Sequence, residues 1–229
     1  MMKNVAFFFG IGILMLASCK PAQRITYNTN KLNTIEIRND NRSLSVQTFE
    51  DIRSQSEQNA THFASQKWQV RINGEQTCIN SEVLYKTPVA EQMTFIFAEH
   101  LSKQVPQLKV SINQKEHSDY YLEAKIRHFY GRQKFSTAAA VGAGFGLIGA
   151  LATAGAKTEG TVIIELADIK LFNRQGDLIA MIGDFRKEYE GEFPADAHCY
   201  CIYANVNQKL AEFNEDLIRL ILLELQNKR

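Results

Sequence analysis

The sequence predicts an α+β domain in which one antiparallel sheet is covered on one face by two helices. Three observations predict this architecture. Several segments alternate apolar and polar residues, as half-buried strands do, and two longer segments place apolar residues at helical spacing. The order along the chain is strands, a helix, more strands and a final helix. We expect one such domain over residues 42–229, with no internal repeat.

The first strand is expected at Ser43 to Phe49, where Leu44 and Val46 alternate with polar residues. Trp68 to Ile72 alternates again and ends at Asn73-Gly74, a dipeptide that strongly favours a hairpin turn. The second strand of that hairpin is expected around Thr77 to Ile79.

Two helices are predicted from their apolar stripes. The first begins at Thr87-Pro88, because proline favours the first helical position, and ends before Pro106. Its apolar face consists of Val89, Met93, Ile96, Phe97, His100 and Leu101. The second runs from about Tyr203 to Asn227, and its buried stripe is expected to consist of Val206, Leu210, Phe213, Leu217, Leu220, Ile221 and Leu225.

The remaining strands lie between the two helices. They are expected at Leu108 to Ile112, Asp119 to Tyr130, Gly160 to Phe172 and Leu178 to Tyr189. Alternation places His128 on one apolar face of its strand, together with Tyr120, Leu122, Ala124, Ile126 and Tyr130. The alternation of apolar residues shifts by one position between Leu166 and Ile169, which predicts a β-bulge. Residues 173–177 predict a turn between antiparallel strands.

The N-terminal residues 1–18 have the composition of a secretion signal. Lys3 precedes an apolar run from Val5 to Ala17 that is short for a bilayer span. The tetrapeptide Leu16-Ala17-Ser18-Cys19 resembles the lipobox of bacterial lipoproteins. That resemblance implies cleavage before Cys19 and attachment of acyl chains, palmitate among them, to Cys19, which would anchor the protein in a membrane.

Residues 19–41 are polar and are expected to form a flexible tether. No acidic stretch follows Cys19, which favours a tether that faces the periplasm rather than the cell surface. Removal of residues 1–18 takes only Lys3 from the 26 basic residues and none of the 25 acidic ones, so the mature chain is electrically neutral. Neutrality argues against nucleic-acid binding and against attachment to anionic lipid by charge alone.

Three cysteines follow the expected lipidation site. In an oxidising compartment Cys78 could form a disulfide with Cys199 or Cys201, which leaves one thiol over. The spacing of His198-Cys199-Tyr200-Cys201 is not that of a structural zinc site. We therefore expect no metal and no cofactor.

A glycine-rich apolar segment, Ala138 to Ala156, separates two predicted strands. It has neither a phosphate-loop ending nor a dinucleotide fingerprint. Gly142 and Gly146 form a small-residue pair suited to close helix contact. Three interpretations stay open: packing on the protein's own core, a membrane- or partner-facing tip that includes Phe145, Leu147 and Ile148, and a membrane span.

No motif in the sequence indicates enzymatic chemistry. The five histidines are scattered, and there is no His-Glu-x-x-His or Gly-x-Ser-x-Gly motif. His100 and His128 lie on apolar faces and are expected to be structural. Asp51 and Arg53 follow the first strand on one side; they either contact a partner or form an ion pair that fixes the strand end.

Several features of the chain together resemble a group of bacterial proteins. They are the lipobox, the Phe49-x-Asp51-x-Arg53 strand end, the helix from Pro88, the strand that begins Asp119-Tyr120-Tyr121-Leu122-Glu123, the hairpin around Gly176 and the closing helix. The bacterial proteins are the small α+β outer-membrane lipoproteins of Gram-negative bacteria, which include auxiliary lipoproteins of lipid-transport ABC systems and the YajG-like lipoproteins. The Ala138–Ala156 segment departs from the simpler members.

The resemblance implies a non-catalytic accessory component of an envelope complex for transport or assembly. Its partners would be the membrane, through Cys19, and an envelope protein. Two alternatives stay open: a protein that binds a lipid or other apolar ligand between sheet and helices, and a homo-oligomer that uses the glycine-rich segment as a membrane assembly.

Overall fold

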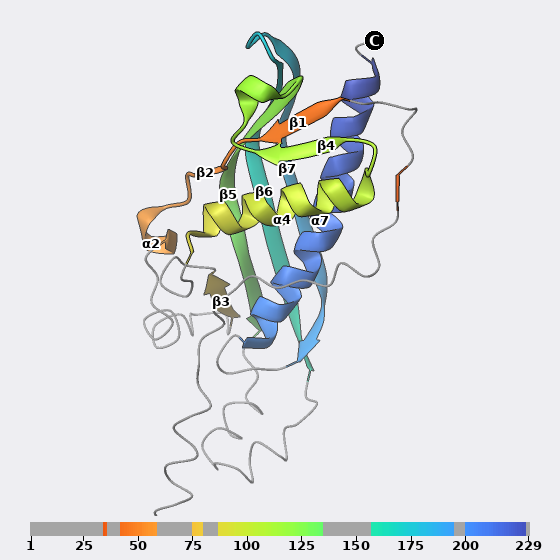
Figure 1. Ribbon diagram of the computed structural model, residues 1–229. Coiled ribbons are helices and arrows are strands. Elements are labelled where there is room, and N and C mark those ends of the chain that lie inside the picture. The colour runs from red at the N-terminus through yellow and green to blue at the C-terminus, as the bar shows by residue number, and fades with distance from the viewer. Residues whose placement is uncertain are drawn as a thin grey trace, which may run out of the picture.

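The computed structural model describes residues 34–35, 42–58, 75–79, 87–134, 157–194 and 200–227. Helices α4 (Val89–Gln104) and α7 (Tyr200–Asn227) lie on one face of a sheet (Figure 1). The predicted fold class, an α+β arrangement with two helices on one sheet, is confirmed. The short helices α2 (Gln55–Gln58) and η2 (Lys115–His117) lie in connections.

The described strands form one sheet with the central order β4-β1-β5-β6-β7. Their bounds are β1 (Ser43–Val46), β4 (Lys109–Ile112), β5 (Tyr120–Lys134), β6 (Lys157–Asn173) and β7 (Leu178–Pro194). Two short strands, β2 (Glu50–Asp51) and β3 (Glu75–Ile79), pair with β5. The strand expected near Thr77 is therefore present as β3, whereas its predicted partner at residues 68–72 and the turn at 73–74 lie outside the described residues.

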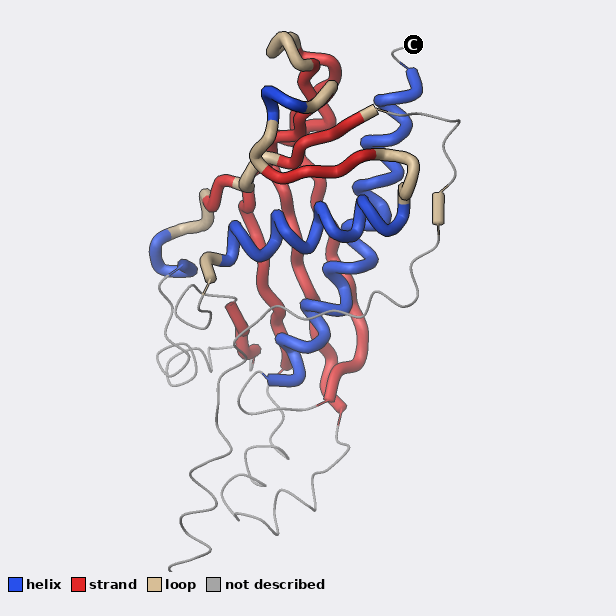
Figure 2. Tube along the Cα trace, viewed as in Figure 1, coloured by secondary structure: helices blue, strands red, loops and turns tan. Residues whose placement is uncertain are grey.

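The sheet is mixed, which corrects the expectation of a wholly antiparallel one. β1 pairs in parallel with both β4 and β5, and β2 pairs in parallel with β5. The connection between β1 and β4 contains α4, and a crossover of this length returns the chain to the start of the sheet, so β1 and β4 run parallel. The connection from β4 to β5 passes through η2, and β5 runs in the same direction as β1. The long strands β5, β6 and β7 are antiparallel, as predicted. They lie side by side in the sheet (Figure 2).

The predicted bulge in β6 is confirmed. The register between β6 and β7 shifts between Leu166 and Ile169, and Asp168 has a positive φ of 53°. Gly183, the partner of Ile169, has a φ of 82°, a conformation that glycine adopts without the steric cost of a Cβ. The bulge keeps Leu166 and Ile169 both in the core despite their odd spacing.

A second irregularity, in β5, corrects the predicted orientation of His128. The register between β5 and β6 shifts between Ile126 and His128. The core residues of β5 are Leu122, Ala124, Ile126 and then Phe129, so the parity changes at this point. His128 and Tyr130 consequently lie on the face of the sheet opposite to the core, rather than on the face of Leu122.

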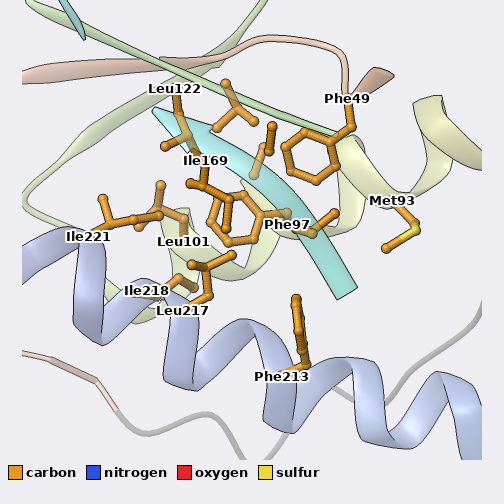
Figure 3. Packing of buried hydrophobic residues seen from close by; sticks show 14 of the residues in the cluster. Phe49, Met93, Phe97, Leu101, Leu122, Ile169, Phe213, Leu217, Ile218 and Ile221 are labelled. Atoms are coloured by element: carbon orange, nitrogen blue, oxygen red, sulfur yellow. The ribbon is translucent and has the colours of Figure 1, made fainter. Parts of the chain in front are cut away.

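The core lies between the sheet and the two helices. Phe97 and Leu101 of α4 meet Phe213, Leu217 and Ile221 of α7 over the sheet (Figure 3). All the predicted apolar residues of α4 are buried. On α7, however, Leu220 is 37% exposed, and Ile218 and Leu222 are buried in its place.

The chain enters the sheet beside the C-terminal ends of both helices. The N–H of Ile35, within the expected tether, donates to the Gln104 carbonyl at 2.7 Å. Arg42 Nη1 donates to the Leu225 carbonyl at 3.1 Å. Both acceptors lie in last helical turns, where carbonyls lack partners within the helix. β1 pairs with the first residues of β5, so this entry lies at the end of the sheet opposite to Lys134 (Figure 1).

Candidate functional site

The face of the sheet turned away from α4 and α7 is the candidate functional site. On β6, Val162 and Ile164 belong to the core, so strand alternation places Ile163 and Glu165 on the other side. We call this other surface, formed by β5, β6 and β7, the open face. Neither α4 nor α7 covers it (Figure 2).

Glu165 is the buried centre of the open face, with only 5% of its surface exposed. Arg127 Nη1 donates to Glu165 Oε1 at 2.6 Å, and Arg186 Nη1 donates to Glu165 Oε2 at 3.1 Å. His128 Nε2 lies 3.9 Å from Glu165 Oε2. A buried carboxylate is costly unless charged or polar groups compensate it, so the two arginines are what make this position tolerable.

Ion pairs continue from Glu165 toward the end of the sheet at which β1 pairs with β5. Arg127 Nη1 contacts Asp184 Oδ2 at 2.5 Å, and Asp184 Oδ1 accepts the backbone N–H of Asp168 at 3.0 Å. Asp168 pairs with Lys170 at 2.7 Å and with Lys125 at 3.3 Å. We call the set of Lys125, Arg127, Glu165, Asp168, Lys170, Asp184 and Arg186 the ionic ladder; Glu50 and Glu188 extend it through ion pairs with Lys125 and Arg186.

Donors in the ladder lower the pKa of two of its acids, Asp168 and Asp184. The backbone N–H of Asp168 is the main cause that lowers the pKa of Asp184, followed by Arg127. A hydrogen bond from Lys170 is the main cause that lowers the pKa of Asp168. Carboxylates that stay ionised at neutral pH accept hydrogen bonds but have no proton to donate. Asp168 and Asp184 therefore act as hydrogen-bond acceptors in the ladder.

The open face is hollowed at the end of the sheet farthest from β1. The groove has a volume of about 560 Å³. It is lined by Arg132, Lys134, Glu159, Gly160, Thr161, Ile163, Arg186, Glu188, Glu190, Gly191 and Glu192. Its lining comes from all three long strands, which makes its walls part of the most extensively paired region of the sheet.

The Asp51–Arg53 pair lies apart from the ladder and is largely buried. Arg53 Nη2 contacts Asp51 Oδ2 at 2.6 Å, and the side chains are 1% and 13% exposed. The backbone N–H of Arg53 also donates to Asp51 Oδ1 at 3.1 Å. Burial and local bonding favour the second sequence interpretation, an ion pair that fixes the end of the strand, because little of either side chain is accessible to a partner.

His100 has a structural environment as well. It is fully buried on α4, and its Nδ1 lies 3.2 Å from Asn214 Nδ2 on α7. Burial is the main cause that lowers the pKa of His100 from its ordinary value of 6.5 to about 4. A neutral imidazole that joins two helices in the core stabilises their contact and is remote from solvent.

Several predicted site residues lie outside the described residues. These are Cys19, Gly142, Phe145, Gly146, Leu147, Ile148 and Cys199. Cys78 belongs to β3 and Cys201 to α7, but only their backbone is described. The lipidation, the disulfide and the contact role of the glycine-rich segment therefore stay predictions.

The sequence analysis did not find the ionic ladder. The available signal was Glu165, an acidic residue within the apolar run of β6. A charge in a buried strand indicates a partner but does not identify it. The partners are 38 and 21 residues away, and only the strand register brings them together.

The described residues include no cluster of three or more His, Cys, Asp or Glu side chains that could hold a metal ion. In the same part of the chain, no helix is both long enough and apolar enough to cross a bilayer.

Comparison with known proteins gives no family. No family model matches the chain, and no curated protein matches it. Among solved structures, it is similar to a Xanthomonas campestris protein of the family DUF330, with 14% identity, a TM-score of 0.48 and coverage of 90% of this chain and 95% of that one. It is also similar to a protein described only as uncharacterized, with 15% identity, a TM-score of 0.39 and coverage of 87% and 99%.

A further similar structure is the PelC dodecamer from Paraburkholderia phytofirmans, with 10% identity, a TM-score of 0.34 and coverage of 84% of this chain and 93% of that one. The Xanthomonas campestris and Paraburkholderia phytofirmans proteins are both bacterial. Identities and TM-scores this low carry no argument about function.

Proposed function

We propose that the chain is a non-catalytic lipoprotein, anchored by acylated Cys19 in the outer membrane and facing the periplasm, that serves as an accessory component of an envelope complex. The observation that carries the proposal is the open face. In the described part of the chain, the fold buries one side of its sheet under two helices, and the other side presents a broad polar surface of both charge signs. Such a surface suits docking to a protein that carries the complementary pattern.

The described chain enters the domain far from the groove of the open face. The chain enters the sheet at the end beside the C-terminal turns of α4 and α7, where Ile35 and Arg42 are bonded. β5 spans 15 residues, so its far end at Lys134 is about 50 Å away. The groove of the open face therefore lies at the end of the sheet opposite to the entry of the chain.

The charge balance of the open face supports a protein partner rather than a membrane surface. The ladder contains four basic residues, Lys125, Arg127, Lys170 and Arg186, and three acidic ones, Glu165, Asp168 and Asp184. Two further acids, Glu50 and Glu188, pair with its Lys125 and Arg186. Most of its charge is already compensated internally. Adhesion to anionic lipid needs an excess of basic residues, and the ladder has almost none.

Photo-cross-linking in cells tests which face docks. We place a photoreactive residue at Glu123, which lies on the open face because Leu122 and Ala124 belong to the core. The control position is Phe95, which is 60% exposed on α4. We expect a discrete cross-linked complex with an envelope protein from position 123 and none from position 95.

Charge reversal sharpens that test. Lys125→Glu changes an exposed member of the ladder and should reduce the cross-link from position 123 at least about tenfold, because close like charges across an interface are strongly unfavourable. Lys103→Glu, on α4, is the matched control and should leave the cross-link unchanged. Cross-links that form from position 95 instead, or none from either position, would contradict docking through the open face.

The two alternative functions stay predictions. The residues between the sheet and the helices pack as a continuous apolar core, so no described feature favours an apolar ligand there (Figure 3). Assembly through the glycine-rich segment concerns residues 138–156, which lie outside the described residues.

A further inference from the structure

Among the described residues, most charged side chains in the groove on the open face form ion pairs, but two do not. Five of its seven charged lining residues belong to ion pairs: Lys134 with Glu159, Arg186 with Glu188, and Glu192 with Lys157 at 3.7 Å. Within the described chain, Arg132 and Glu190 have no ion-pair partner. The groove therefore presents one uncompensated positive charge and one uncompensated negative charge.

These two residues lie in the same row across the three strands. Arg132 is paired in register with Thr161 on β6, and Thr161 is paired with Glu190 on β7. Alternation places all three side chains on one face. Two interstrand spacings separate the backbones of Arg132 and Glu190, a distance of about 10 Å. The short side chain of Thr161 leaves the space between them open.

Arg132 does not turn toward Glu190, because Tyr130 holds it. Arg132 Nη2 donates to the Tyr130 hydroxyl at 3.0 Å, and the guanidinium carbon lies 5.3 Å from the centre of the Tyr130 ring. The hydroxyl and the ring fix the guanidinium without neutralising its charge. Tyr130 is itself 7% exposed and Ile163, beside it on β6, is 3% exposed, so the support under the groove is well packed.

We propose that the groove binds a small zwitterion, with its anionic group on Arg132 and its cationic group on Glu190. A simple anion would be repelled by the glutamates of the groove, and a simple cation by Arg132 and Arg186. A ligand that carries both charges compensates both unpaired residues at once. The volume of about 560 Å³ lies within the range of small-molecule sites.

Phosphoethanolamine has this chemistry, and it occurs both as a free molecule and as a phospholipid headgroup. The first measurement is calorimetric titration of the full-length mature protein, in dodecyl maltoside, with phosphoethanolamine. Glycerol 3-phosphate and ethanolamine serve as ligands with only one of the two charges. We expect phosphoethanolamine to bind about tenfold or more tightly than either, because only it forms both charge-assisted contacts.

Two variants locate the binding site. Arg132→Gln and Glu190→Gln change exposed side chains and should each weaken phosphoethanolamine binding by about tenfold, since each removes one charge-assisted contact. Glu123→Gln is the matched control, an exposed glutamate on the same face outside the groove, and should leave the Kd unchanged. The exchange variant Arg132→Glu/Glu190→Arg keeps one charge of each sign and should bind more tightly than Arg132→Glu alone.

A second arm distinguishes the two sources of the ligand. Dodecyl maltoside micelles that contain phosphatidylethanolamine are compared with micelles that contain phosphatidylglycerol. The ligand is a lipid headgroup if three results agree. The protein binds phosphatidylethanolamine micelles more tightly than phosphatidylglycerol micelles and more tightly than free phosphoethanolamine, and the groove variants weaken binding to the phosphatidylethanolamine micelles. If only the free molecule binds, the ligand is a soluble zwitterion. The proposal is overturned if neither form binds, or if both groove variants bind as the wild type does.

Binding of a zwitterion in the groove and docking of a protein on the open face are tested by separate measurements. A failed titration would leave the cross-link from position 123 intact, and a failed cross-link would leave the titration intact.

Discussion

Replacement of Asp51 by alanine is expected to lower the free energy of unfolding by about 3 kcal/mol, because it removes the carboxylate that the buried guanidinium of Arg53 contacts through both Nε and Nη2. The side chain of Arg53 is 1% exposed, so water cannot take over the lost contact. The same substitution removes the acceptor of the Arg53 backbone N–H. Urea denaturation of the two proteins, compared at pH 7, measures the difference.

The neighbouring acid provides the control. Glu50 pairs with Lys125 at 3.5 Å, but its side chain is 64% exposed. Exposed ion pairs contribute about 0–1 kcal/mol, so Glu50→Ala should change stability by less than Asp51→Ala does. Equal effects of the two substitutions would contradict the structural role of the Asp51–Arg53 pair.

The second large effect concerns acid stability and arises from His100. The folded protein binds a proton at His100 with a pKa of about 4, whereas the unfolded chain binds it with a pKa near 6.5. Between these values the unfolded state holds more protons, so stability falls as the pH is lowered through this window. The loss between pH 7 and pH 4.5 is expected to be about 2 kcal/mol from this group.

The charged neighbours of His100 do not cancel that effect. Glu99 and Glu215 raise its pKa and Lys103 lowers it, but burial is the largest cause. His100→Gln keeps an amide that can bond Asn214 and has no proton to gain. The variant should therefore lose about 2 kcal/mol less than the wild type between pH 7 and pH 4.5 in urea denaturation. Identical losses in the two proteins would contradict a buried neutral His100.

The local elements of this fold could be predicted from the sequence because their signals are local. Pro88 and Pro106 delimit α4, which runs from Val89 to Gln104. The parity change between Leu166 and Ile169 marks the bulge in β6. Each of these features depends on the physics of a few neighbouring residues.

The features that the sequence did not reveal depend on contacts between distant segments. The parallel pairing of β1 follows from the path of the chain through α4, and the orientation of His128 depends on a register shift against β6. The ladder arises in the same way, because Glu165 meets Arg127 and Arg186 only once β5, β6 and β7 are paired. The unpaired charges of the groove become visible only after every neighbouring ion pair is known.

The central claim, an acyl-anchored lipoprotein, is tested most directly by the intact mass of the protein isolated from outer membranes. The account predicts a chain that begins at Cys19 and carries the additional mass of its acyl chains. It also predicts that replacement of residues 1–19 by a signal peptide that is cleaved without lipidation releases the domain into the soluble periplasmic fraction. A chain that retains residues 1–18, or an unmodified Cys19, would contradict it.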